Sequence, residues 1–99
     1  MALKIVKIGT YWAGLLSRAS VDIIALDYDW WHSLAEADDQ LEPGEEPMPL
    51  SPEGLMYYGR VEQALQPDEP TWPDTFGHTT ISEAMQALEL KLGKQVRWQ

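Results

Sequence analysis

Cysteine is absent from the sequence, which excludes disulfide bonds and thiolate chemistry. This absence fits a reducing compartment, and we expect the chain to lie in the cytoplasm. Long hydrophobic runs are also absent, so we expect no membrane-spanning segment and no membrane partner. The ten residues between Lys7 and Arg18 include two glycines and a threonine, whereas the core of a secretory signal would be more apolar.

Basic residues are scarce and unevenly placed. Seven Lys and Arg accompany sixteen Asp and Glu, which gives a net charge of -9. Residues 19–59 hold ten acids and no base, residues 61–90 hold six more acids and no base, and Arg60 stands alone between them. Such a surface repels phosphate backbones, so we expect no direct binding of nucleic acid. The same charge favours docking on a basic protein.

Alternating hydrophobic residues predict an α+β fold, which we expect to form a single domain over residues 1–99. Two alternating stretches flank residues 13–19, where Gly14 favours a hairpin over a short helical turn. The second stretch is rich in β-branched and aromatic residues, which places it near the centre of a sheet. The expected architecture is a mainly antiparallel sheet of about four strands. The predicted strands are residues 3–12, 20–29, 55–65 and 94–99.

A C-terminal helix over residues 81–92 is predicted by its capping signals. Thr80 and Glu83 have the spacing of a capping box, and Gly93 follows as a stop signal. The helix between them carries an apolar stripe, which we expect to pack on the sheet. This stripe consists of Ile81, Met85, Leu88 and Leu92.

A short helix is expected directly after the second strand, with Asp29 as its N-cap. The alternative is that the strand continues through the tryptophan pair. Both interpretations bury Trp30, because it continues the apolar face of the strand and also begins the apolar stripe of the helix. Trp31 lacks this double support, so we expect it to be partly exposed. The helical stripe is Trp30, Leu34, Ala37 and Leu41.

Two proline-rich segments are predicted to be loops, because proline cannot donate a backbone hydrogen bond. Residues 42–54 hold four prolines and four acids, and residues 66–79 hold the other three prolines. In the second loop, we expect Trp72 and Phe76 to pack inward and anchor the chain.

The carboxylates and histidines form no recognisable metal site or catalytic motif. Ligands that suit zinc, manganese or iron occur close together in Asp27, Asp29, His32 and Glu36. Their spacing matches no known metal motif, and the sequence does not place His78 beside His32, so we expect no metal and no cofactor. No serine lies in a G-x-S-x-G motif and no glycine-rich phosphate loop is present, so we predict no catalytic residue.

Acidic charge and surface aromatics favour a non-enzymatic protein-binding module. Such a module would dock on a basic partner, as small inhibitors and immunity-type proteins dock on nucleic-acid-binding proteins. An exposed tryptophan also suits a homodimer. The acids have a simpler role as well, because solvated acidic loops keep proteins soluble. The expected partner-binding residues are Trp31, Glu36, Asp38, Asp39, Glu45 and Glu46.

The alternative function is small-ligand binding or catalysis in an aromatic pocket of the α+β domain. Tyrosine or histidine would act there as an acid or a base. One deep cavity would favour this alternative, whereas aromatics on a flat or convex acidic face would favour the binding module. The expected pocket residues are Tyr28, Trp30, His32, Tyr57 and Tyr58.

Overall fold

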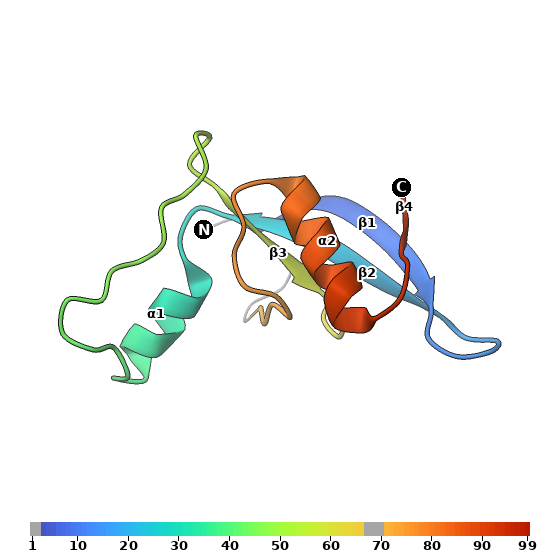
Figure 1. Cartoon of the computed structure of the whole chain (residues 1–99), viewed down its shortest axis with the longest axis horizontal. Helices are drawn as coiled ribbons and strands as arrows, with labels where there is room; N and C mark the ends of the chain where they lie inside the picture. The colour runs from blue at the N-terminus through green and yellow to red at the C-terminus, as the bar shows by residue number, and fades with distance from the viewer. Residues whose placement is uncertain (1–2, 67–70) are drawn as a thin grey trace.

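The sheet and helices of the computed structural model confirm the predicted α+β fold (Figure 1). The structure describes residues 3–66 and 71–99. Antiparallel strands form one four-stranded sheet in the order β3-β2-β1-β4, so β2 lies inside the sheet, as its hydrophobic sequence predicts. The strands are β1 (Lys4–Trp12), β2 (Arg18–Leu26), β3 (Met56–Arg60) and β4 (Arg97–Trp98), and the helices are α1 (Trp30–Ala37) and α2 (Ile81–Leu92).

The two longest strands, β1 and β2, form the predicted hairpin. Trp12 pairs with Arg18 at the end of the ladder, and the backbone N–H of Ala13 donates to the carbonyl of Ser17 at 2.8 Å. This bond closes the turn over residues 13–17. The hairpin extends beyond the helices, so its tip forms one end of the molecule (Figure 1).

Helix α2 covers one face of the sheet and forms much of the core with it. Ala84 and Leu88 are fully buried in a cluster with Val21, Ile23 and Tyr57. The alternation of β2 and β3 supplies these inward side chains, because every second residue of a strand faces the same side. The predicted packing of the α2 stripe on the sheet is therefore confirmed at its centre.

Both predicted ends of α2 are also confirmed. The Thr80 hydroxyl accepts a hydrogen bond from the backbone N–H of Glu83 at 3.1 Å. Gly93 has a φ of 67°, and its N–H donates to the carbonyl of Glu89 at 2.9 Å. In the described part of the chain, no helix is both long and apolar enough to cross a membrane.

The opposite face of the sheet carries a second apolar cluster at the start of α1. Trp30 packs there with Ile24, Leu26, Met56 and Tyr58. This arrangement confirms that Trp30 is buried, and Trp31 is partly exposed, as predicted. Both faces of the sheet are therefore covered over β2 and β3, which explains why all five residues of β3 are buried.

Asp29 caps α1 as predicted and also fixes the loop that follows the helix. One of its carboxylate oxygens accepts from the N–H of His32 at 3.1 Å, and the other accepts from the N–H of Met48 at 2.8 Å. The predicted apolar stripe is shorter than expected. Trp30 is buried, but Ala37 is exposed, because α1 ends at that residue and extends past the sheet (Figure 1).

Strand β3 ends earlier than predicted. The alternating sequence predicted a strand over residues 55–65, but the ladder ends at Arg60, and residues 61–65 form turns. Leu65 has a φ of 66°, which a strand excludes, and its N–H donates to a carboxylate oxygen of Asp22 at 2.9 Å. The chain turns here because its backbone groups bind a buried ion pair instead of continuing the ladder.

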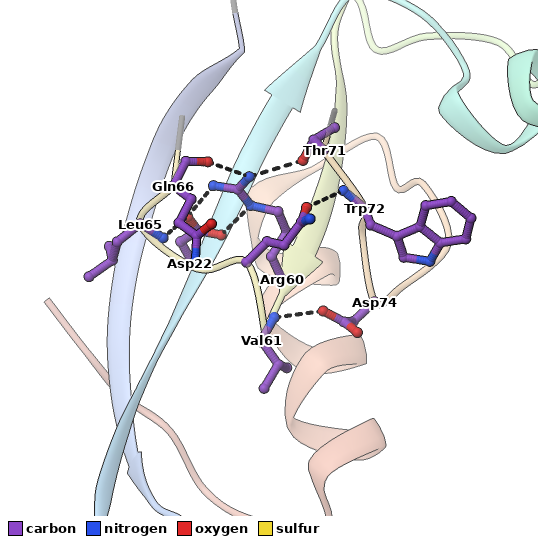
Figure 2. Close-up of polar contacts among 9 residues, drawn as sticks. Asp22, Arg60, Val61, Leu65, Gln66, Thr71, Trp72 and Asp74 are labelled. Carbon is purple, nitrogen blue, oxygen red and sulfur yellow. Dashed lines mark hydrogen bonds and ion pairs between the residues drawn. The ribbon is translucent and has the colours of Figure 1, made fainter. Parts of the chain in front are cut away.

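This ion pair joins β3 to β2 and ties the following loop to the sheet (Figure 2). The Nε and Nη2 atoms of Arg60 donate to the two carboxylate oxygens of Asp22 at 2.9 and 2.7 Å, and both side chains are fully buried. Nη1 of Arg60 donates to the carbonyl of Gln66 at 2.8 Å and to the hydroxyl of Thr71 at 2.9 Å. The guanidinium group therefore holds both Gln66 and Thr71 against the sheet.

After Thr71, the chain runs alongside β3. The N–H of Asp74 donates to the carbonyl of Gly59 at 2.8 Å, and His78 exchanges two backbone hydrogen bonds with Tyr57 at 2.8 and 2.9 Å. These bonds satisfy backbone groups at an edge of the sheet, which would otherwise be open to another strand.

The expectation that Trp72 and Phe76 anchor this segment is wrong. Trp72 is 52% exposed and Phe76 is 73% exposed, so neither is packed inward as an anchor. Burial alternates along the segment, as in a strand, and the buried side falls on the intervening residues. The residues that pack inward are Thr71, Pro73, Thr75 and Gly77.

Candidate functional site

An apolar groove of about 490 Å³ lies between the outer side of α2, the segment over residues 74–78 and the first turn of α1. We call it the aromatic groove. Its apolar walls come from elements far apart in the sequence, so only the folded chain brings them together. They are Trp31, Phe76, Ala87 and Leu90, and the other lining residues are Asp74, Thr75, His78 and Lys91.

The groove residues Trp31 and Phe76 belong to a cluster of four aromatic rings that also contains Trp30 and Trp72. The Trp30 ring lies 4.9 Å from both the Trp31 ring and the Trp72 ring, at interplanar angles of 85° and 76°. The Trp31 ring also lies 5.7 Å from the Phe76 ring. Such T-shaped contacts are favourable for aromatic pairs, so the buried Trp30 holds the outer rings in place.

Trp31 is fixed by a hydrogen bond as well as by ring contacts. Its indole N–H donates to the carbonyl of Thr75 at 2.8 Å, and this bond joins α1 to the 74–78 segment. On the other side of the groove, Nζ of Lys91 donates to the carbonyl of Asp74 at 2.7 Å and joins α2 to the same segment. Both walls of the groove are therefore held by defined bonds.

The outer rim of the aromatic groove is exposed apolar surface. Leu90 is 85% exposed on α2, and Trp72 and Phe76 are exposed on the loop. Figure 2 shows the Trp72 indole directed away from the ion pair, opposite to Thr71. Large apolar side chains that gather at a surface in this way are typical of protein-protein interaction sites.

Acidic residues continue from α1 into the loop that follows it. Glu36, Asp38 and Asp39 lie at the C-terminal end of α1, and all three are exposed. Glu45 and Glu46 are also exposed. Negative charge at a helix C-terminus opposes the helix dipole, so these acids do not stabilise α1 through its dipole.

The predicted partner-binding residues therefore come from one continuous segment. Trp31 lies in the first turn of α1 and lines the aromatic groove, whereas the acids lie at the far end of the helix and beyond it. In Figure 1, α1 and the loop after it form the end of the molecule opposite the hairpin tip. Negative charge is thus concentrated at this end.

The five residues of the predicted ligand pocket do not share one cavity. Tyr57 belongs to the cluster under α2, whereas Trp30 and Tyr58 are packed in the cluster on the other face. Tyr28 and His32 line a second groove of about 410 Å³. The acids Asp27, Asp29 and Glu36 also line this second groove, with Ser33, Pro47, Met48 and Leu50.

The two tyrosines of β3 are held as neutral phenols. Burial raises the pKa of Tyr58 to about 12, and its hydroxyl accepts from the N–H of Trp30 at 2.7 Å and donates to the carbonyl of Tyr28 at 3.2 Å. Burial and the nearby Glu53 carboxylate raise the pKa of Tyr57. Phenols with a raised pKa stay protonated near neutral pH, so neither hydroxyl is ionised there.

Metal binding has no support in the geometry of the described residues. Within residues 3–66 and 71–99, no three His, Asp or Glu side chains are grouped so that they could hold a metal ion. Nε2 of His32 is buried and, among the described residues, has no hydrogen-bond partner.

Comparison of the chain with known proteins gives no match to a family model, a curated protein or a solved structure.

Sequence reasoning identified Trp31 but missed the rest of the aromatic groove. Phe76 was expected to pack inward, and Leu90 lies off the predicted stripe of α2. A leucine on the polar side of an amphipathic helix was a usable signal, because it predicts an exposed apolar residue. The proximity of Leu90 to Trp31 depends on tertiary structure and could not be predicted from the sequence.

Proposed function

We propose that this chain is a non-enzymatic protein-binding module that docks on a basic protein through the aromatic groove. The single observation that carries the proposal is the exposed apolar surface of Phe76 and Leu90 on a groove whose walls are held in place, continued by the exposed Trp72 beside Trp31. Aromatic side chains that are already ordered bind with little loss of conformational entropy. The groove is therefore suited to an apolar side chain or helix of a partner.

The acids of α1 and its following loop select the charge of that partner. Glu36, Asp38 and Asp39 are exposed and, like Glu45 and Glu46, belong to the segment that supplies Trp31. Complementary charge mainly raises the association rate and rejects partners of the same sign. A nucleic-acid-binding protein has the required basic surface, so an inhibitor or immunity-type role is the specific form of the proposal. We place this role in the cytoplasm, because the chain has no cysteine.

The aromatic groove supports binding of a protein better than the alternative of a small-ligand pocket. Its rim is exposed, and its apolar lining faces solvent beside an acidic helix. The residues expected for a ligand pocket are divided between the two faces of the sheet. A homodimer would use the same aromatic surface, and the experiment below distinguishes the two occupants.

Affinity capture with the whole chain tests the proposal. We expect immobilised wild-type chain to retain a basic protein from the source cell, and Trp72→Ala to lose it. Trp12→Ala is the matched control, because Trp12 is 56% exposed but lies at the end of β1, beside the hairpin turn. The retained protein should elute as salt rises, because contacts between exposed charges are screened.

The charge requirement needs a separate variant. Replacing Glu36, Asp38 and Asp39 with Gln, Asn and Asn should slow association with the purified partner and leave far-UV circular dichroism unchanged. Equal retention by wild type and Trp72→Ala contradicts the proposed docking site. Retention of an acidic protein contradicts the proposed partner. If the wild type self-associates and Trp72→Ala does not, the occupant of the groove is a second copy of this chain.

A further inference from the structure

The tip of the β1–β2 hairpin exposes three large apolar side chains. Leu15 is 98% exposed, Leu16 is 94% exposed and Trp12, at the base of the turn, is 56% exposed. The tip projects from the end of the molecule opposite α1 (Figure 1). Exposure of apolar side chains to water is unfavourable, so this concentration of apolar surface indicates that the tip binds another apolar surface.

Cations surround the base of this tip. The Arg18 guanidinium lies 5.3 Å from the Trp12 ring, and Nζ of Lys94 donates to the carbonyl of Trp12 at 2.8 Å. Arg97 pairs with Thr10 one strand away and is exposed. The segments beside the tip, residues 9–20 and 93–99, contain three bases, Arg18, Lys94 and Arg97, and no acid.

We propose that the hairpin tip docks on an anionic lipid surface. The side chains follow the order of such a surface, with leucines outermost, a tryptophan behind them and cations behind the tryptophan. Leucine prefers the acyl chains, tryptophan prefers the interface, and lysine and arginine bind anionic headgroups. Trp12, Leu15 and Lys94 also line an open groove of about 630 Å³ that could seat a headgroup.

A lipid surface fits the tip better than a protein does. The leucines project from a narrow turn, whereas protein interfaces are broad patches with a packed centre. A fluid bilayer accepts isolated apolar side chains without a complementary pocket. The site is also independent of the aromatic groove, which lies on other elements, so failure of either proposal leaves the other standing.

The net negative charge of the chain does not prevent this docking. All sixteen acids lie between Asp22 and Glu89, and the exposed acids of α1 and its loop lie at the far end of a molecule about 48 Å long. Charges in physiological salt are screened over about 8 Å. An anionic lipid surface in contact with the tip therefore interacts mainly with the charges at the basic end of the molecule. The expectation of no membrane partner rested on the lack of a spanning segment, and surface docking needs none.

Vesicle co-sedimentation of the full chain tests the proposal. We expect binding to phosphatidylcholine vesicles that contain phosphatidylserine, weaker binding at high salt, and little binding to phosphatidylcholine alone. The double substitution Leu15→Ser and Leu16→Ser should weaken binding about tenfold. Met48→Ser is the matched control, because Met48 is 51% exposed in the loop after α1, away from the hairpin tip, and its loss should change nothing.

A second pair of variants tests the charge. Arg18→Gln with Lys94→Gln should abolish the preference for anionic vesicles, whereas Arg18→Lys with Lys94→Arg should retain it. Failure to bind anionic vesicles, equal binding to both vesicle types, or an equal loss in Met48→Ser would overturn the proposal. Concentration-dependent self-association without vesicles that the serine variant removes would also overturn it, in favour of a second copy of this chain.

Discussion

Replacing Arg60 with methionine should destabilise the fold by about 3–5 kcal/mol, which is the usual cost of removing one partner from a buried ion pair. Arg60 makes hydrogen bonds to Asp22, Gln66 and Thr71, and it is fully buried. Without it, the only bond to the Asp22 carboxylate from the described residues would come from the N–H of Leu65. Methionine fills similar space, so the loss would come from the unpaired charge and not from a cavity.

The size of this loss is large relative to the expected stability. A domain of this length unfolds with a free energy of about 5–15 kcal/mol. Urea denaturation followed by far-UV circular dichroism would measure the difference. Arg97→Met is the matched control, because Arg97 is exposed on β4, and we expect it to change the free energy of unfolding by less than about 0.5 kcal/mol.

A double substitution separates the unpaired charge from the lost hydrogen bonds. Arg60→Met with Asp22→Leu removes both charges, so it should be more stable than Arg60→Met alone. It should remain less stable than wild type, because Leu65, Gln66 and Thr71 still lose their partners. The reasoning is refuted if Arg60→Met costs no more than Arg97→Met, or if the double variant is the less stable of the two.

Three further predictions concern the core and can be checked by the same urea denaturation. Leu88→Ala should cost about 2–5 kcal/mol because it opens a cavity under α2, whereas Thr80→Ala should cost about 1 kcal/mol through the lost cap; equal small losses would contradict the packing. Trp30→Ala should cost about 3–5 kcal/mol, and Trp31→Ala only about 1–2 kcal/mol, because Trp31 is partly exposed; equal losses would contradict this assignment. Burial raises the pKa of Tyr58 to about 12, so its neutral form contributes stability that is complete below about pH 10, the pKa of tyrosine in the unfolded chain. This contribution is lost as pH rises toward 12. An equally steep fall in the stability of Tyr58→Phe would exclude this cause.

Local signals in the sequence were sufficient for most of the fold. Thr80 and Gly93 set the ends of α2, and Asp29 starts α1, because capping depends on the residues next to the helix. The alternating hydrophobic residues of β1 and β2 predicted the hairpin, because the two strands are neighbours in the sequence. These elements could be predicted because their determinants lie within a few residues of one another.

Features that depend on contacts between distant residues were not predicted. The end of β3 depends on the pairing of Arg60 with Asp22, although the isolation of Arg60 in an acidic stretch was a visible signal. The outward direction of Trp72 and Phe76 depends on hydrogen bonds between their segment and β3. Hydrophobicity alone predicted that both side chains pack inward, but the backbone pairing of the segment with β3 directs them outward.

The candidate site was predicted only where it lies on one element. Trp31 and the acids of α1 belong to a continuous segment, and the sequence pointed to them as a possible partner surface. The aromatic groove also needs Leu90 from α2 and Phe76 from the loop. Three segments separated by many residues meet there, and no local pattern encodes their meeting.

Side-chain NMR of the complex with the captured partner tests the proposed docking site most directly. Each tryptophan gives its own indole N–H signal in a chain labelled with nitrogen-15. We predict that the signals of Trp31 and Trp72 shift when the purified basic partner is added, because Trp31 lines the aromatic groove and the exposed Trp72 lies beside it, and that the signal of Trp12, next to the hairpin tip, does not. A shift of Trp12 with unchanged signals of Trp31 and Trp72 would contradict the account.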